Sequence, residues 1–126
     1  MIVHTILYVA DQNRSSEFYK RVLGMELKLN VPGMTEFKLS ESHILGLMPE
    51  KGIKKLLGDT IPDPNQSAGI PRAELYFRVK NPDEMFKRAI ESGSKILSEI
   101  VPRDWGDRVG YVMDPDGHVL AFASSL

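Results

Sequence analysis

Apolar and polar positions follow the same order twice along this chain. Residues 3–11 and 73–81 are both strand-like, rich in aliphatic and aromatic side chains. The first strand ends at Asp11 and the second at Asn81, and both residue types cap helices well. Pro82 then takes the first helical position, where its missing N–H costs nothing. The pattern therefore predicts a strand followed by a helix in each half of the chain.

The two expected helices share the spacing of their apolar residues. Each set takes positions i, i+1, i+4 and i+5, which form one stripe on a helix. Gly24 ends the first helix and Gly93 the second, because glycine readily takes the left-handed conformation at a helix end. The stripes consist of Phe18, Tyr19, Val22 and Leu23 in the first helix, and Met85, Phe86, Ala89 and Ile90 in the second.

Three further strand-like segments follow each helix. We therefore expect an α+β fold in which two βαβββ modules, residues 1–49 and 73–126, form one domain over residues 1–126. A linker over residues 50–72 joins them, with a short helix at Ile53–Leu57 and a polar, proline-rich end. The expected strands span residues 25–31, 34–40 and 43–48 in the first module, and 95–101, 108–113 and 118–124 in the second.

Alternation along the strands divides their side chains between two faces. If the helices cover one face, the other face presents ionisable and hydroxyl-bearing groups in both modules. A sheet curved around that face would form a cup with polar groups inside. The side chains expected there are His4, Ile6 and Tyr8 from the first strand, and Glu74, Tyr76 and Arg78 from its counterpart.

Several of these residues also have a structural interpretation. His4 lies near the end of its strand, where a partly buried histidine without function is common. Glu74 lies in an apolar strand, and a buried carboxylate is costly without a partner. Arg78 is either the partner of Glu74 or a side chain that extends its charged head to solvent.

Composition narrows the possible partners. The chain has 126 residues, a formal net charge of −1 and no cysteine. The balanced charge gives no reason to expect binding to nucleic acid or to an anionic membrane, and the lack of cysteine excludes disulfides and thiolate metal sites. The N-terminal residues alternate like a strand, so we do not expect a signal peptide there, and no apolar run approaches the roughly 18 residues of a membrane span. We therefore expect a cytoplasmic protein.

Two segments resemble the vicinal oxygen chelate superfamily. They are HTILYVADQNRSSEFYKRVLGMEL at residues 4–27 and YVMDPDGHVLAF at residues 111–122. The superfamily includes glyoxalase I, bleomycin-resistance proteins, extradiol dioxygenases and fosfomycin-resistance enzymes. The resemblance implies paired βαβββ modules, a cup-shaped binding site and a homodimer.

In the metal-using members, ligands come from the first and last strands of each module. The resemblance places these positions at His4, Gly46, Glu74 and Ala121. Gly46 and Ala121 have no donor atoms. With only one histidine and one carboxylate as protein ligands, a divalent cation would be coordinated mostly by water. We therefore expect no bound cofactor.

The leading hypothesis is a small-molecule-binding protein that works without a complete metal site. Gly46 and Ala121 would open space inside the cup, and the polar residues would anchor an organic ligand. Trp105 would stack on a flat ligand at the rim, or it packs on its own loop or on the dimer partner. Its neighbours Arg103, Asp107 and Arg108 are expected to be solvated charges. The expected ligand-binding residues are Tyr8, Tyr76, Arg78, Trp105, Ala121 and Gly46.

Two alternatives remain open. One is a lyase or epimerase similar to glyoxalase I, with Glu74 as the catalytic base and His4 as its partner. The same two residues could instead hold a weakly bound metal. The other is a structural or regulatory dimer whose cup is filled by linker side chains such as Leu56, Leu57 and Ile61.

Overall fold

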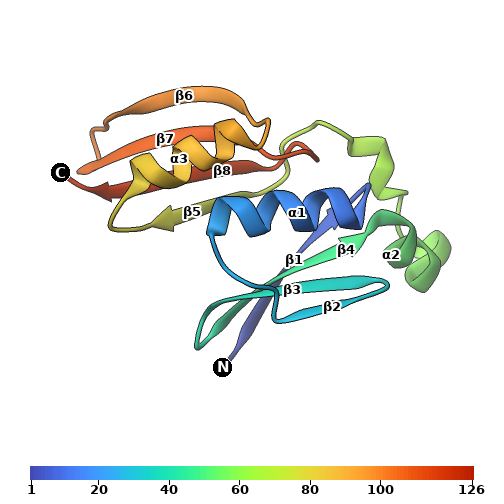
Figure 1. Ribbon diagram of the computed structural model, residues 1–126. Coiled ribbons are helices and arrows are strands. Elements are labelled where there is room, and N and C mark those ends of the chain that lie inside the picture. The colour runs from blue at the N-terminus through green and yellow to red at the C-terminus, as the bar shows by residue number, and fades with distance from the viewer. The chain divides into compact units, whose positions relative to one another are not determined.

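The computed structural model describes all 126 residues, which form two compact units (Figure 1). The first unit comprises residues 1–20 and 24–68, and the second comprises residues 21–23 and 69–126. Each unit contains one four-stranded mixed sheet. The predicted α+β class with two βαβββ modules is confirmed.

The first unit orders its strands β1-β4-β3-β2. β1 and β4 run parallel, and the remaining neighbours are antiparallel. β2 is shorter than predicted, because pairing with β3 begins only at the Lys28 N–H bond to the Glu36 carbonyl (2.7 Å). The elements are β1 (Val3–Val9), α1 (Gln12–Leu23), β2 (Leu29–Val31), β3 (Met34–Ser40), β4 (His43–Pro49) and α2 (Glu50–Leu57), followed by 3₁₀ turns at Gly58–Thr60 and Pro64–Ser67.

The second unit repeats this plan in the order β5-β8-β7-β6. Again the first and last strands pair in parallel, and the others pair antiparallel. No helix in either unit has the length and apolar character needed to cross a membrane. The elements are β5 (Glu74–Arg78), α3 (Pro82–Glu91), β6 (Lys95–Pro102), β7 (Asp107–Met113) and β8 (Val119–Ser125).

The predicted helix caps are confirmed. The Asp11 side chain accepts a hydrogen bond from the Arg14 N–H at the start of α1, and Gly24 ends that helix with a φ of 64°. The Asn81 side chain accepts from the Glu84 N–H in α3, and Gly93 follows this helix with a φ of 93°. α2 begins at Glu50, three residues before the expected start at Ile53.

α3 packs closely against the second sheet. The Phe86 ring meets Phe122 edge-on at 6.4 Å, and Phe77 stacks on Phe122 at 6.0 Å. Gly110 of β7 permits this approach, because an added Cβ would lie 2.9 Å from Phe86 and 2.5 Å from Ile100. A glycine at this position therefore sets the distance between helix and sheet.

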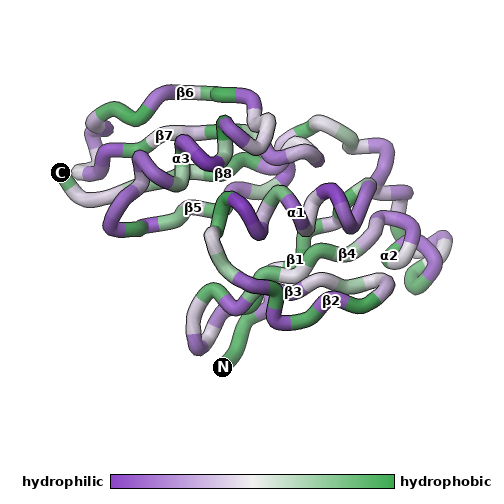
Figure 2. Tube along the Cα trace, in the orientation of Figure 1, coloured by the Kyte–Doolittle hydropathy of each residue, from purple (hydrophilic) through white to green (hydrophobic).

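The predicted alternation of faces is present in both sheets. In β1, Leu7 and Val9 are buried, whereas His4, Ile6 and Tyr8 are exposed. We call the exposed side of each sheet its open face. The strands β4 and β8, which pair in parallel with β1 and β5, are largely apolar (Figure 2) and buried over most of their length.

The DPDG segment forms the predicted tight turn between β7 and β8. Asp114 Oδ1 accepts hydrogen bonds from the N–H groups of Asp116 (2.9 Å) and His118 (2.8 Å). Gly117 has a φ of 93°, and a Cβ there would lie 2.7 Å from the backbone of Gly69. The linker therefore passes directly over this turn.

Candidate functional site

A chain of hydrogen bonds runs across the open face of the second sheet. Asp107 Oδ2 accepts from Tyr76 Oη at 2.7 Å and from Arg78 Nη1 at 2.5 Å. Trp105 Nε1 donates to Tyr76 Oη at 2.9 Å. Arg78 Nη2 donates to Ser125 Oγ at 3.1 Å. We call these five residues the Asp107 network.

Strand register brings the network together. Tyr76 and Arg78 lie two positions apart on β5, so they share a face. Asp107 begins β7 and pairs with Ser125 of β8. Trp105 lies in the turn just before β7, where Gly106 takes a φ of 94°. The network therefore joins three strands and one turn within a single unit.

The network also fixes protonation states. Hydrogen bonds from Tyr76 and then Arg78 lower the pKa of Asp107, although burial opposes them. Burial, followed by the bond to Asp107, raises the pKa of Tyr76. The bond to Asp107 raises the pKa of Arg78. At neutral pH the group thus holds a carboxylate, a guanidinium and a protonated phenol.

Beneath the network, the open face has a closed apolar floor. Val109, Ala121 and Ala123 are fully buried, and Tyr111 packs against them. The Arg103 guanidinium lies 5.3 Å from the centre of the Tyr111 ring and also donates to the Val109 carbonyl at 2.8 Å. Burial raises the pKa of Tyr111, and the charge of Glu74 adds to this increase.

The first sheet carries a different polar group on its open face. Glu36 of β3 lies with Oε2 3.5 Å from His4 Nδ1 and Oε1 3.8 Å from Lys28 Nζ. The Glu36 side chain is only 15% exposed, whereas both partners are more than 40% exposed. Glu36 pairs in register with Gly46 of β4, and His4 pairs with Ile44 of the same strand.

The space expected at Gly46 and Ala121 is not open. A Cβ on Gly46 would lie 3.1 Å from Ile6 Cγ1 and 3.2 Å from Met34 Sδ, so these side chains already close over the glycine. Ala121 is fully buried in the cluster against which Tyr111 packs. Larger neighbouring side chains occupy the space that these two small residues leave. Both positions therefore form part of the floor of the open face.

Asp107 and Arg103 are not the solvated charges expected from the sequence. Asp107 is buried and accepts two side-chain hydrogen bonds, and Arg103 is partly buried against Tyr111. Arg108 differs, since it forms an ion pair at 2.8 Å with Asp83, and both side chains are partly exposed. The alternation of side chains along β7 could have indicated that Asp107 lies on the open face, because it places Asp107 on the same face as Tyr111.

Glu36 was not among the residues expected on the open face. The alternation of Met34, Glu36 and Lys38 along β3 could have placed it on the open face. Arg78 was expected either to pair with Glu74 or to extend its charge to solvent; it pairs with Asp107, and its side chain is 55% exposed. Glu74 is itself exposed and not buried.

Only two of the four positions that hold metal ligands in the superfamily carry a side chain able to bind a divalent cation. His4 lies in the first unit and Glu74 in the second, while Gly46 and Ala121 have no donor atoms. Within either unit, no three His, Cys, Asp or Glu side chains are grouped so that they could hold a metal ion.

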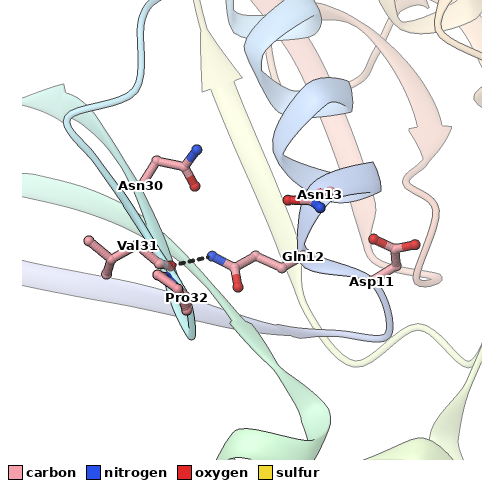
Figure 3. A pocket seen from close by; sticks show the side chains of 6 residues that line it. All are labelled: Asp11, Gln12, Asn13, Asn30, Val31 and Pro32. Carbon is pink, nitrogen blue, oxygen red and sulfur yellow. Dashed lines mark hydrogen bonds between the residues drawn. The ribbon is translucent and has the colours of Figure 1, made fainter.

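The first unit has a hollow of about 420 Å³ at the start of α1 (Figure 3). The Gln12 side chain crosses it and donates to the Val31 carbonyl at 2.8 Å, while its Oε1 accepts from the Gly33 N–H at 3.0 Å. Gln12 thereby holds the β2–β3 turn against the helix. The lining residues are Asp11, Gln12, Asn13, Asn30, Val31 and Pro32.

A second hollow, of about 240 Å³, lies in the second unit beside the Asp107 network. It is lined by Arg78, Val79, Lys80, Ser124 and Ser125. Of the linker residues considered as a plug, Leu56 and Leu57 are exposed and Ile61 is partly buried.

Comparison with known proteins gives consistent matches over nearly the whole chain. The model of the Glyoxalase/Bleomycin resistance protein/Dioxygenase superfamily matches residues 1–122. A protein named lactoylglutathione lyase from Escherichia coli is 30% identical over 121 residues, which cover 94% of this chain and 88% of that protein.

Solved structures show the same fold. A glyoxalase/bleomycin resistance protein/dioxygenase from Nocardioides has a TM-score of 0.79 at 22% identity, and the match covers 100% of this chain and 83% of that one. A protein of unknown function from Agrobacterium tumefaciens has a TM-score of 0.80 at 23% identity, covering 100% and 94%.

Proposed function

Because the chain belongs to the glyoxalase/bleomycin resistance protein/dioxygenase superfamily, we propose that it binds a small, flat organic molecule without a complete metal site. The binding surface is the open face of the second sheet, between Trp105, Tyr76 and Tyr111. The Asp107 network is the observation that carries this proposal, because it holds two exposed aromatic side chains in fixed positions.

The chemistry of this face suits a ligand site. Trp105 is 55% exposed and Tyr76 is 37% exposed, so both rings offer surface for stacking. Their hydrogen bonds order them before any ligand arrives, which reduces the entropy lost on binding. Aromatic walls with a few placed polar groups are typical of small-molecule sites.

Trp105 is the only tryptophan, so its fluorescence reports directly on this face. Titration with a panel of flat aromatic compounds should quench or shift its emission with saturation. Tyr76→Phe removes the hydroxyl that Trp105 and Asp107 share, and we expect binding to weaken about tenfold, the effect of losing roughly 1.4 kcal/mol. Lys87→Gln, on the exposed side of α3, is the matched control. Saturable binding that Tyr76→Phe leaves unchanged would place the ligand elsewhere.

A lyase or epimerase is the second candidate, favoured by the relative named lactoylglutathione lyase. In that case Glu74 would act as the base, with His4 as its partner. Gly46 and Ala121 offer no donors, so we expect no appreciable lactoylglutathione lyase turnover with added Ni²⁺ or Zn²⁺. Turnover that is lost in Glu74→Gln would favour the enzyme over the binding protein.

The homodimer and the cytoplasmic location expected from the sequence stay predictions. Light scattering of the purified protein tests the first, and fractionation of the native host tests the second.

A further inference from the structure

Arg78 connects the aromatic surface to the neighbouring hollow. Its Nη1 and the Tyr76 hydroxyl bond to the same oxygen of Asp107, so the guanidinium and the phenol lie side by side. Arg78 also lines the hollow of about 240 Å³, together with Lys80 and Ser125. A ligand that stacks on Tyr76 would therefore extend toward this hollow.

The hollow is suited to an anion. Its lining includes two cationic side chains and two serines but no carboxylate. Arg78 is 55% exposed even though Asp107 and Ser125 hold it in place. A guanidinium has five N–H donors, so a fixed, half-exposed arginine still presents donors outward. Asp107, the partner of Arg78, is buried and is not among the residues that line the hollow.

We propose that the ligand is an aromatic acid, whose flat ring lies on Trp105 and Tyr76 and whose carboxylate enters the hollow beside Arg78, Lys80 and Ser125. This inference rests on the proposed function, since it names the class of ligand for the same face. The hollow can hold a carboxylate with a few waters, given that a water occupies about 30 Å³.

Two probes of matched shape test the inference. 2-Naphthoate carries a carboxylate, and 2-naphthamide replaces it with a neutral amide. We expect calorimetry and Trp105 emission to show that the acid binds at least about tenfold more tightly, as a charge-assisted contact would provide. Added salt should weaken binding of the acid and leave that of the amide unchanged.

Substitutions locate the anion. Lys80→Gln leaves the Asp107 network intact and should weaken 2-naphthoate about threefold or more, with no effect on 2-naphthamide. Arg78→Lys keeps the charge but loses the guanidinium fork, so it should weaken the acid further. Lys87→Gln, on α3 and not among the residues that line the hollow, should change neither probe.

The outcomes separate the two proposals. If 2-naphthoate and 2-naphthamide bind with equal affinity, the proposal of an aromatic acid is overturned. The proposal that a flat ligand stacks on Trp105 would then still hold. Preference for the acid that neither Lys80→Gln nor Arg78→Lys reduces also overturns it, because the anion would then bind elsewhere. If neither probe binds and Trp105 emission does not change, the aromatic surface itself fails as a binding site.

Discussion

Single residues decide how the open face of the second sheet behaves. Asp107 is the residue on which the others depend, because one of its oxygens accepts from both Tyr76 and Arg78. The sequence suggested a solvated charge in a polar loop. Asp107 is buried because it bonds to Tyr76 and Arg78, which lie about thirty positions away along the chain. The local pattern of polar and apolar residues cannot reveal such partners. By contrast, the exposed face of β5 was predictable from alternation alone.

The first prediction concerns Asp107 and pH. Its pKa in the folded protein is lowered, so the ionised carboxylate stabilises the fold above the pKa of an unfolded aspartate. That contribution is lost as the pH falls through the lower folded value. Asp107→Asn should therefore unfold at a lower temperature than wild type near neutral pH, and the difference should shrink toward about pH 3.

Thermal unfolding of both proteins across this range checks the prediction. Asp59→Asn, in an exposed turn, serves as the control and should show a small difference at every pH. A difference for Asp107→Asn that stayed constant with pH would mean that ionisation of Asp107 has no part in stability.

At the scale of elements, the sequence was most reliable where the information is local. Caps, apolar stripes and turn residues predicted α1, α3 and the β7–β8 turn, since each depends on residues a few positions apart. β2 was overestimated because an edge strand exists only where a neighbour pairs with it. The start of α2 was missed because Pro49 has no side-chain cap to mark it.

The second prediction compares two glycine substitutions with opposite outcomes. Gly110→Ala would place a methyl group 2.9 Å from Phe86, which must then move away from the sheet. We expect a loss of about 1–3 kcal/mol in the free energy of unfolding, as for other overpacked cores. Gly52→Ala in α2 meets only Met48 at 3.5 Å, so it should stabilise by about 0.5–1 kcal/mol.

Chemical denaturation of the two variants measures both effects. A stable Gly110→Ala protein would show that α3 does not need this close approach to β7. Destabilisation by Gly52→Ala would mean that the alanine strains α2 in a way its measured spacing does not indicate.

For the whole molecule, the two units share a backbone plan but differ in the chemistry of their open faces. The first presents His4 beside Glu36, and the second presents the Asp107 network. The repeat predicted the shared plan because apolar periodicity determines which face is buried. It could not predict the networks, since each needs side chains from strands far apart in sequence.

The third prediction follows from this difference. If 2-naphthoate binds the second sheet, hydrogen exchange should slow in β5, β7 and β8 and remain unchanged in β1 to β4. At one hundred times its Kd, the ligand should add about 2.7 kcal/mol to the stability of the state that binds it. Equal protection of both sheets would argue against a site confined to the second unit.

The buried central strands β4 and β8 have a further consequence for how such a chain can diversify. Each holds its sheet together through largely apolar side chains, and Ser125, at the end of β8, is the one polar side chain that either strand contributes to the Asp107 network. Substitutions on the other strands of a sheet can therefore alter one recognition surface while β4 or β8, and the other copy of the plan, stay intact. A duplicated architecture of this kind can gain a new specificity in one half without first losing its capacity to fold.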